Sequence, residues 1–198
     1  MVRSPSASTL PESPKRAELV ETAWRLFYRD GYHAVGIDTV LAEAGVAKMT
    51  LYKHFPSKED LIAEVLERRS RELRANLDRM VEGAGRSPTK RLLAIFDAFD
   101  ALFHGADFNG CAFIKAVAEY PDPKSAPHRV AAAHKAALRA RLTELAEELP
   151  ARDAEALASS LVLLAEGAIV TAHVQGRKTA AREAAEAARI LIAAAKRG

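Results

Sequence analysis

A run of cationic and hydroxyl side chains near residue 50 carries the most interpretable chemistry in this 198-residue sequence. On a helix these side chains would surround one outward face, together with one apolar methionine: Lys48, Met49, Thr50, Tyr52, Lys53 and His54. No acidic residue occurs from position 46 to position 57. Ammonium groups and hydrogen-bond donors without a nearby carboxylate suit a polyanion, so the run predicts contact with a nucleic acid.

Two short helices would have to position this face. The first is predicted from apolar residues at helical spacing, which would form one buried stripe: Ile37, Val40, Leu41 and Ala44. Gly45 is expected to end this helix, because glycine readily takes the left-handed conformation of a helix stop.

The second helix is expected to bury Ala47, Leu51 and Phe55, which are spaced four residues apart. Met49 and Lys53 would then point away from the core. Two short helices joined by a tight glycine turn form the helix-turn-helix, whose second helix enters the major groove of DNA. Similar corners are common in all-helical proteins, so the spacing alone leaves both interpretations open.

The flanking sequence favours the first interpretation. Residues 23–32 would close a preceding helix, and residues 55–61 would open the next one. Taken together, residues 14–74 resemble the DNA-binding domain of the TetR family of bacterial transcriptional regulators. The run 45–55, followed by Ser-Lys-Glu-Asp-Leu at 57–61, is the most specific part of this resemblance.

The resemblance implies an all-α fold with two domains. Residues 14–74 would form an N-terminal three-helix DNA-binding domain, with its helix-turn-helix motif at 36–55. Residues 75–198 would form a C-terminal helical domain that binds an effector and dimerises. Residues 1–13 lack the apolar core of a signal peptide and are expected to be a disordered arm.

The resemblance also implies which residues would contact a double-stranded DNA operator: Lys48, Met49, Thr50, Tyr52, Lys53, His54 and Lys58. The first three would meet base edges or nearby phosphates, with the methionine against an apolar surface such as a thymine methyl group. Tyr52, His54 and Lys58 would hold phosphates, and Lys53 could do either.

Two residues depart from the family pattern. Gly36 stands where the family usually has a hydroxyl residue that caps the helix and touches a phosphate. Ala47 replaces the serine that frequently caps the recognition helix. The sequence therefore predicts that both caps are missing.

The longest apolar run spans residues 156–174. Its length would admit a membrane span, but Ser159, Ser160, Glu166 and His173 interrupt it and no basic cluster flanks it. A helix that is apolar on every side must be buried on every side, so a second subunit is expected to cover one face. The expected homodimer interface pairs this helix with the last one: Leu161, Ala165, Gly167, Ala168, Ala184 and Ala188.

Phenylalanines gather in the middle of the chain, where five of the seven lie within eighteen residues. They could be ordinary core, or they could line an apolar cavity, as aromatic side chains do in many small-molecule sites. Glu166 and His173, two turns apart on the apolar helix, could add polar groups. The resemblance implies an unidentified small-molecule effector, and its expected site is formed by Phe96, Phe99, Phe103, Phe113, Glu166 and His173.

Enzyme and metal motifs are absent from the sequence, which has no phosphate-binding glycine loop, zinc-type Cys/His pairing or nucleophile elbow. Asp97, Asp100 and His104 share one helix face, which is interpreted as a solvated surface rather than a metal site. The single Cys111 and a net charge of +3 suit a cytoplasmic protein without disulfides.

The sequence therefore predicts a ligand-responsive, homodimeric regulator, most simply a repressor without cofactor. A cytosolic helical enzyme or ligand carrier, and a helical protein–protein adaptor, are the alternatives.

Overall fold

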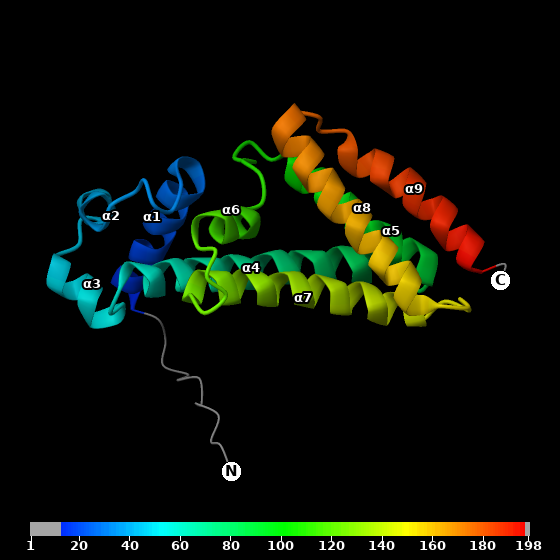
Figure 1. The fold of residues 1–198 in the computed structure, drawn as a ribbon, viewed down its shortest axis with the longest axis horizontal. Coiled ribbons are helices and arrows are strands. Elements are labelled where there is room, and N and C mark those ends of the chain that lie inside the picture. Colours follow the sequence, from blue (N-terminus) through cyan, green and yellow to red (C-terminus); the bar gives the residue numbers. More distant parts are fainter. Residues whose placement is uncertain (1–12, 197–198) are drawn as a thin grey trace, which may run out of the picture. The chain divides into compact units, whose positions relative to one another are not determined.

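The computed structural model describes residues 13–196, and this part of the chain is built from α-helices without any strand (Figure 1). The helices are α1 Pro14–Asp30, α2 Ile37–Ala44, α3 Lys48–His54, α4 Lys58–Gly83, α5 Pro88–His104, α6 Ala112–Glu119, α7 Ala126–Glu147, α8 Ala154–Gln175 and α9 Ala180–Ala195. The predicted all-α fold is confirmed. Most of the predicted arm, residues 1–12, lies outside the described residues.

The chain forms two compact units, which meet in sequence between Val65 and Leu66. Helix α4 crosses this point and contributes residues to both units. The domain boundary predicted at residue 74 falls within the same helix and stays a prediction.

The first unit is organised around α1. The Ser13 hydroxyl accepts a hydrogen bond from the Arg16 backbone N–H at 3.3 Å, and Pro14 follows in the first turn, so both residues favour a helix that begins here. Large apolar side chains from α1, α2, α3, α4 and the loop after α1 are fully buried in this unit: Leu19, Phe27, Tyr32, Val40, Leu51, Leu61 and Ile62. Each such burial stabilises the fold by about 1.5–3 kcal/mol, which is how two short helices are held against α1.

The turn between α2 and α3 has the predicted geometry. Gly45 adopts φ 62° and ψ 31°, in the left-handed region, and its N–H donates to the Leu41 carbonyl. Of the residues predicted to be buried in these two helices, all but Ile37 and Ala47 are buried. Ile37 is half-buried, and the prediction for Ala47 is wrong, because Ala47 is the N-cap of α3 and lies before its first turn.

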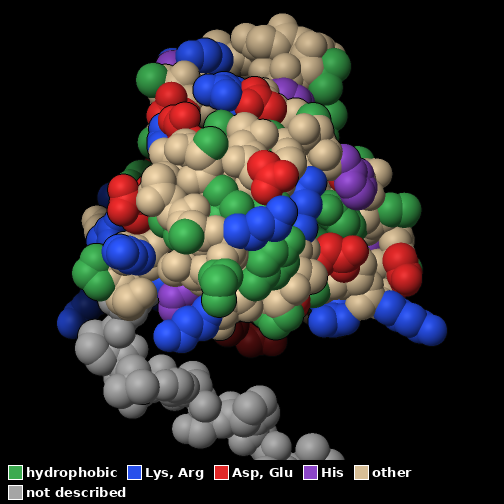
Figure 2. Space-filling view, turned by 90° about the vertical axis from the view of Figure 1, so that its left-hand side faces the viewer, with side chains coloured by type: hydrophobic (Ala, Val, Ile, Leu, Met, Phe, Trp, Pro, Cys, Tyr) green, Lys and Arg blue, Asp and Glu red, His purple; other side chains and the backbone are tan. Residues whose placement is uncertain are grey.

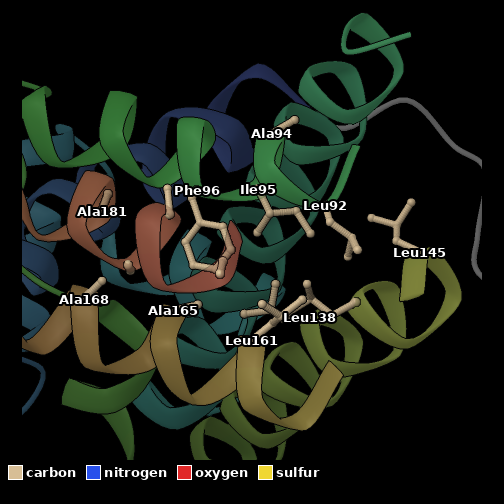
Figure 3. Close-up of a cluster of buried hydrophobic side chains, with 14 of the residues drawn as sticks. Leu92, Ala94, Ile95, Phe96, Leu138, Leu145, Leu161, Ala165, Ala168 and Ala181 are labelled. Atoms are coloured by element: carbon tan, nitrogen blue, oxygen red, sulfur yellow. The ribbon is translucent and has the colours of Figure 1, made fainter. Parts of the chain in front are cut away.

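The second unit packs its helices in neighbouring pairs. Helices α8 and α9 lie side by side, α5 packs on α9, α7 on α8, and α6 on α7 (Figure 1). The core between them is drawn in Figure 3, where Leu92, Ile95 and Phe96 of α5 face Leu138 of α7 and Leu161 of α8.

Helix α6 was not predicted, since only the prolines at 121, 123 and 127 mark this region of the sequence. The chain reaches it through Gly110, which has φ 81°. A Cβ atom added to Gly110 would lie 2.6 Å from the ring of His173 in α8. Glycine is therefore required here for two reasons, the backbone conformation and the close ring.

Helix α8 has two different apolar faces. One face carries seven residues that are buried within the single chain: Leu157, Ala158, Leu161, Ala165, Ala168, Ile169 and Ala172. The other face leaves Leu163 73% and Val174 74% exposed, with Val170 also in solvent. The length and composition of α8 would also suit a membrane span, but a core helix of a soluble protein passes the same test.

This burial bears on the predicted dimer interface, which itself stays a prediction. Five of its six residues lie in the core of one chain: Leu161, Ala165, Ala168, Ala184 and Ala188. The small size of the four alanines lets α8 and α9 of the same chain approach each other. Gly167 alone of the six is exposed.

Candidate nucleic-acid interface

Helix α3 depends on the rest of the first unit for its structure. It has only seven residues, and a helix this short is unstable by itself in water. Leu51 and Phe55 anchor it, since both are buried, and the Phe55 N–H donates to the Leu51 carbonyl at 2.8 Å. The helix is thus fixed on one side and solvated on the other.

The solvated side carries the predicted DNA-contact residues. Met49 is 87% exposed and Tyr52 is 45% exposed. Lys48 and Lys53 are exposed as well, whereas Thr50 is half-buried. Figure 2, seen from the side on which Figure 1 draws α2 and α3, shows lysine and arginine side chains among apolar and acidic ones. On such a face, the exposed methionine can contact base edges and the lysines around it can contact phosphates.

The two remaining predicted contacts are less exposed. His54 is half-buried, with its ring centroid 6.3 Å from that of Phe55. Lys58 is half-buried too: its Nζ donates to the His33 carbonyl at 3.3 Å and lies 5.9 Å from the Phe27 ring centroid. Lys58 therefore holds the loop after α1 as well as offering a charge.

A capping interaction fixes the start of α4 beside these residues. The Asp60 backbone N–H donates to the Ser57 Oγ at 3.1 Å, as in a capping box. The Asp60 carboxylate accepts from the Ser57 hydroxyl at 2.6 Å. The shorter aspartate thus takes its hydrogen bond from the cap side chain.

Two contacts that the sequence did not reveal brace the motif. The Arg16 guanidinium of α1 lies 5.1 Å from the Phe55 ring centroid and pairs with Glu64 of α4 at 2.7 Å. Lys48 pairs with Asp38 of α2, with 3.2 Å between Nζ and Oδ1. Both contacts join different helices, so helical spacing within one segment gave no signal for them.

The predicted effector residues separate into distinct groups in the second unit. The rings of Phe99, Phe103 and Phe108 follow one another at centroid distances of 6.1 and 5.0 Å. The exposed His173 meets Phe108 edge-on at 6.5 Å. Phe96 is buried in the core beside them.

Phe113 belongs to another group. Its ring stacks on the His134 ring of α7, with 3.6 Å between centroids and 9° between planes. Ser70 of α4, itself buried, hydrogen-bonds His134 Nδ1 through Oγ at 2.9 Å. Burial, with the charges of Lys135 and Arg74 adding to it, lowers the pKa of His134 to about 4, so the imidazole is neutral near pH 7.

Glu166 is paired rather than free. Both of its carboxylate oxygens accept from Lys135 Nζ, at 2.8 and 2.6 Å, and the two side chains are partly buried. Among residues 13–196, no three His, Cys, Asp or Glu side chains are grouped so that they could hold a metal ion. Asp100, considered above on its helix face, instead pairs with Arg182 at 3.0 Å.

A glycine turn that presents a short, cationic, exposed helix, followed by a separate helical unit, defines a helix-turn-helix transcriptional regulator. Residues 19–65 match the bacterial regulatory proteins of the tetR family, and residues 88–188 match the tetracyclin repressor-like C-terminal domain. This chain belongs to the TetR family. The family consists of transcriptional regulators rather than enzymes.

Similar structures cover nearly the whole chain. A TetR-family transcriptional regulator from Streptomyces coelicolor is 33% identical, with a TM-score of 0.86, over 92% of this chain and 96% of its own. A putative TetR transcriptional regulator from Streptomyces avermitilis is 32% identical, with a TM-score of 0.77, over 93% and 98%.

Curated relatives match over a shorter part. The transcriptional activator FasR of Mycolicibacterium smegmatis is 38% identical over 46% of this chain and 41% of its own length. The transcriptional repressor DhaR of a Mycobacterium species is 30% identical over 52% and 50%. The chain spans half or less of these two relatives.

Proposed function

We propose that this regulator is a cytoplasmic repressor that binds a palindromic operator as a homodimer and is released by a small-molecule effector. The observation that carries the proposal is the outward face of α3, where Met49 and Tyr52 stand exposed among lysines. The relatives include the activator FasR as well as the repressor DhaR, and the proposal takes the direction of the latter.

The proposed DNA contacts follow from exposure and chemistry. Lys48 and Thr50 donate to base edges or adjacent phosphates, and Met49 packs on an apolar base surface. Tyr52 donates to a phosphate, and Lys53 neutralises one.

His54 and Lys58 contact phosphate at the edge of the interface. Their half-buried positions restrict their motion, which suits a positioning role rather than sequence readout.

The exposed apolar face of α8 supports the homodimer. Leu163, Gly167, Val170 and Val174 are spaced by four, three and four residues, so they form one stripe along the helix. On α9, Ile190 is 70% exposed. A second copy that brings the same stripe would remove these side chains from water at about 25 cal/mol per Å² of apolar area. Two-fold pairing is the commonest closed arrangement for such a surface.

The effector is proposed to be an apolar or amphipathic molecule that binds near Phe99, Phe103 and His173. Phe99 is partly exposed and offers aromatic surface, the buried Phe103 packs against it, and the exposed histidine offers a hydrogen bond. An effector that favours the form unable to bind DNA must itself bind less tightly when DNA is present, by the same factor. Calorimetry of a candidate effector with and without operator measures this coupling, which is about 5- to 150-fold in typical cases.

The DNA-binding proposal is tested with a Tyr52→Ala, Lys53→Ala double variant. Operator affinity should fall at least about 100-fold, and the dependence of binding on salt should become shallower by about 0.9 log unit per lost phosphate contact. Lys178→Ala, an exposed charge change between α8 and α9, is the matched control. Unchanged operator binding by the folded double variant would refute the proposal.

A further inference from the structure

The DNA-facing motif contains a carboxylate at a place where a carboxylate weakens binding to phosphate. Asp38 lies in the first turn of α2, and its side chain is 83% exposed. Its partner Lys48 is the first residue of α3 and is 60% exposed. Because the pair is so exposed, it contributes little to the stability of the fold. The Asp38–Lys48 pair is therefore expected to affect DNA binding rather than folding.

Lys48 has a long, flexible side chain, and the start of a helix does not favour a cation. No acidic residue lies in the first turn of α3. The 3.2 Å contact with Asp38 thus supplies both an orientation for Lys48 Nζ and a counter-charge. It also connects the two helices of the motif across the turn at Gly45.

We propose that Asp38 is a specificity-determining residue that positions Lys48 for a base edge and prevents it from binding phosphates indiscriminately. The inference rests on the proposed DNA-binding function. A phosphate can bind Lys48 only by displacing Asp38, so each non-specific phosphate contact gains somewhat less than it would from a lysine without a carboxylate neighbour. At the correct base pair, Lys48 donates to guanine while keeping Asp38 as its neighbour.

Removal of the Asp38 charge should therefore strengthen non-specific binding to DNA. In Asp38→Asn, Lys48 is free to neutralise one further phosphate per subunit. Affinity for an unselected duplex should rise about five- to tenfold near 0.1 M salt, with a salt dependence steeper by about 0.9 log unit per subunit. The ratio of specific to non-specific affinity should fall about tenfold, because preference at one base pair is relaxed.

The experiment compares two duplexes of equal length: one selected by the wild-type protein from a random library, and one unselected. Glu43→Gln is the matched control, because Glu43 lies on the same helix but pairs with Arg25 of α1, at 3.9 Å. Asp38→Glu keeps the charge and should retain most of the specificity ratio. Melting temperatures of all variants show whether each one is folded.

A double-mutant cycle separates positioning from general electrostatics. With Lys48→Ala already present, Asp38→Asn should no longer change the base preference. An equal effect of Asp38→Asn with and without Lys48 would overturn the inference, as would equal effects of Asp38→Asn and Glu43→Gln on both duplexes. If the wild-type protein does not distinguish the duplexes at all, the proposed function fails as well. If it does distinguish them and Asp38→Asn leaves the ratio unchanged, only the inference about Asp38 fails.

Discussion

Helices α3 and α8 both hold large apolar side chains in solvent, but the neighbours of those side chains differ. On α3, the exposed Met49 stands between Lys48 and Thr50, with Lys53 one turn further on. On α8, the exposed stripe that begins at Leu163 contains apolar residues and one glycine.

The side chains around an exposed apolar residue indicate which kind of partner it can have. Water is removed cheaply from a stripe without charges, and an apolar stripe of the same kind is the simplest partner. Lysines around a methionine keep their water unless an anion replaces it, so the α3 face is suited to a charged, structured surface such as DNA.

The largest predicted effects come from placing a charge on one or the other face of α8. Leu163→Glu places a charge on the exposed face and should give a folded monomer, because a surface substitution changes stability by only about 0.5 kcal/mol. Leu161→Glu, two positions away, places the same charge in the core and should prevent folding, at a cost above about 4 kcal/mol. Light scattering and circular dichroism distinguish the two outcomes. A Leu163→Glu protein that remains a dimer would show that this face of α8 is not the interface.

A smaller effect concerns the interior of the second unit, where His134 of α7 is kept neutral. Its pKa lies below that of an unfolded histidine, so the unfolded chain binds more protons between about pH 6.5 and pH 4. The stability that depends on neutral His134 is complete above pH 6.5 and is lost as the pH falls towards 4. The loss should reach up to about 3 kcal/mol.

Urea unfolding of the wild-type protein and of His134→Gln at pH 7, 5.5 and 4.5 measures this contribution. The variant should lack the part of the pH dependence that belongs to His134, whereas His173→Gln, an exposed histidine on α8, should keep it. Parallel pH curves for the wild-type protein and His134→Gln would contradict the assignment.

The smallest predicted effect is a gain in stability at the start of α3. Ala47 has the extended backbone of an N-cap, φ −69° and ψ 145°, but it lacks a side-chain oxygen. Ala47→Ser should stabilise the first unit by about 1 kcal/mol, since a serine hydroxyl can accept from a backbone N–H of the first turn. Thermal melting of the two proteins measures the gain. Ala47→Val, which is β-branched without a cap oxygen, should give no gain; equal gains from both would exclude capping as the cause.

Helix ends were predictable because their signals are local. Ser13 with Pro14, Gly45, and Asp153 with Gly176 mark helix limits in the sequence, and the structure has helix limits at these residues. The exposure of Lys48, Met49, Tyr52 and Lys53 on α3 was predictable from helical spacing once the buried positions of this helix were assigned.

Contacts between helices were not predictable in this way. Asp38 and Lys48 are ten residues apart on two helices, and Ser70 and His134 are 64 apart, so no single period relates them. The burial of five predicted interface residues was missed for a related reason. Both faces of α8 are apolar, and periodicity does not tell which face is already buried within the same chain.

The contact between Gly110 and His173 restricts which residues can occupy position 110. Its positive φ and the His173 ring leave no room for even one added methyl group, so a substitution at Gly110 would strain the backbone and displace the ring. Gly167, one helical turn before Val170, has open space where its Cβ would stand in the single chain. Among related sequences, the first glycine should persist, whereas the second should vary only as far as a partner surface permits.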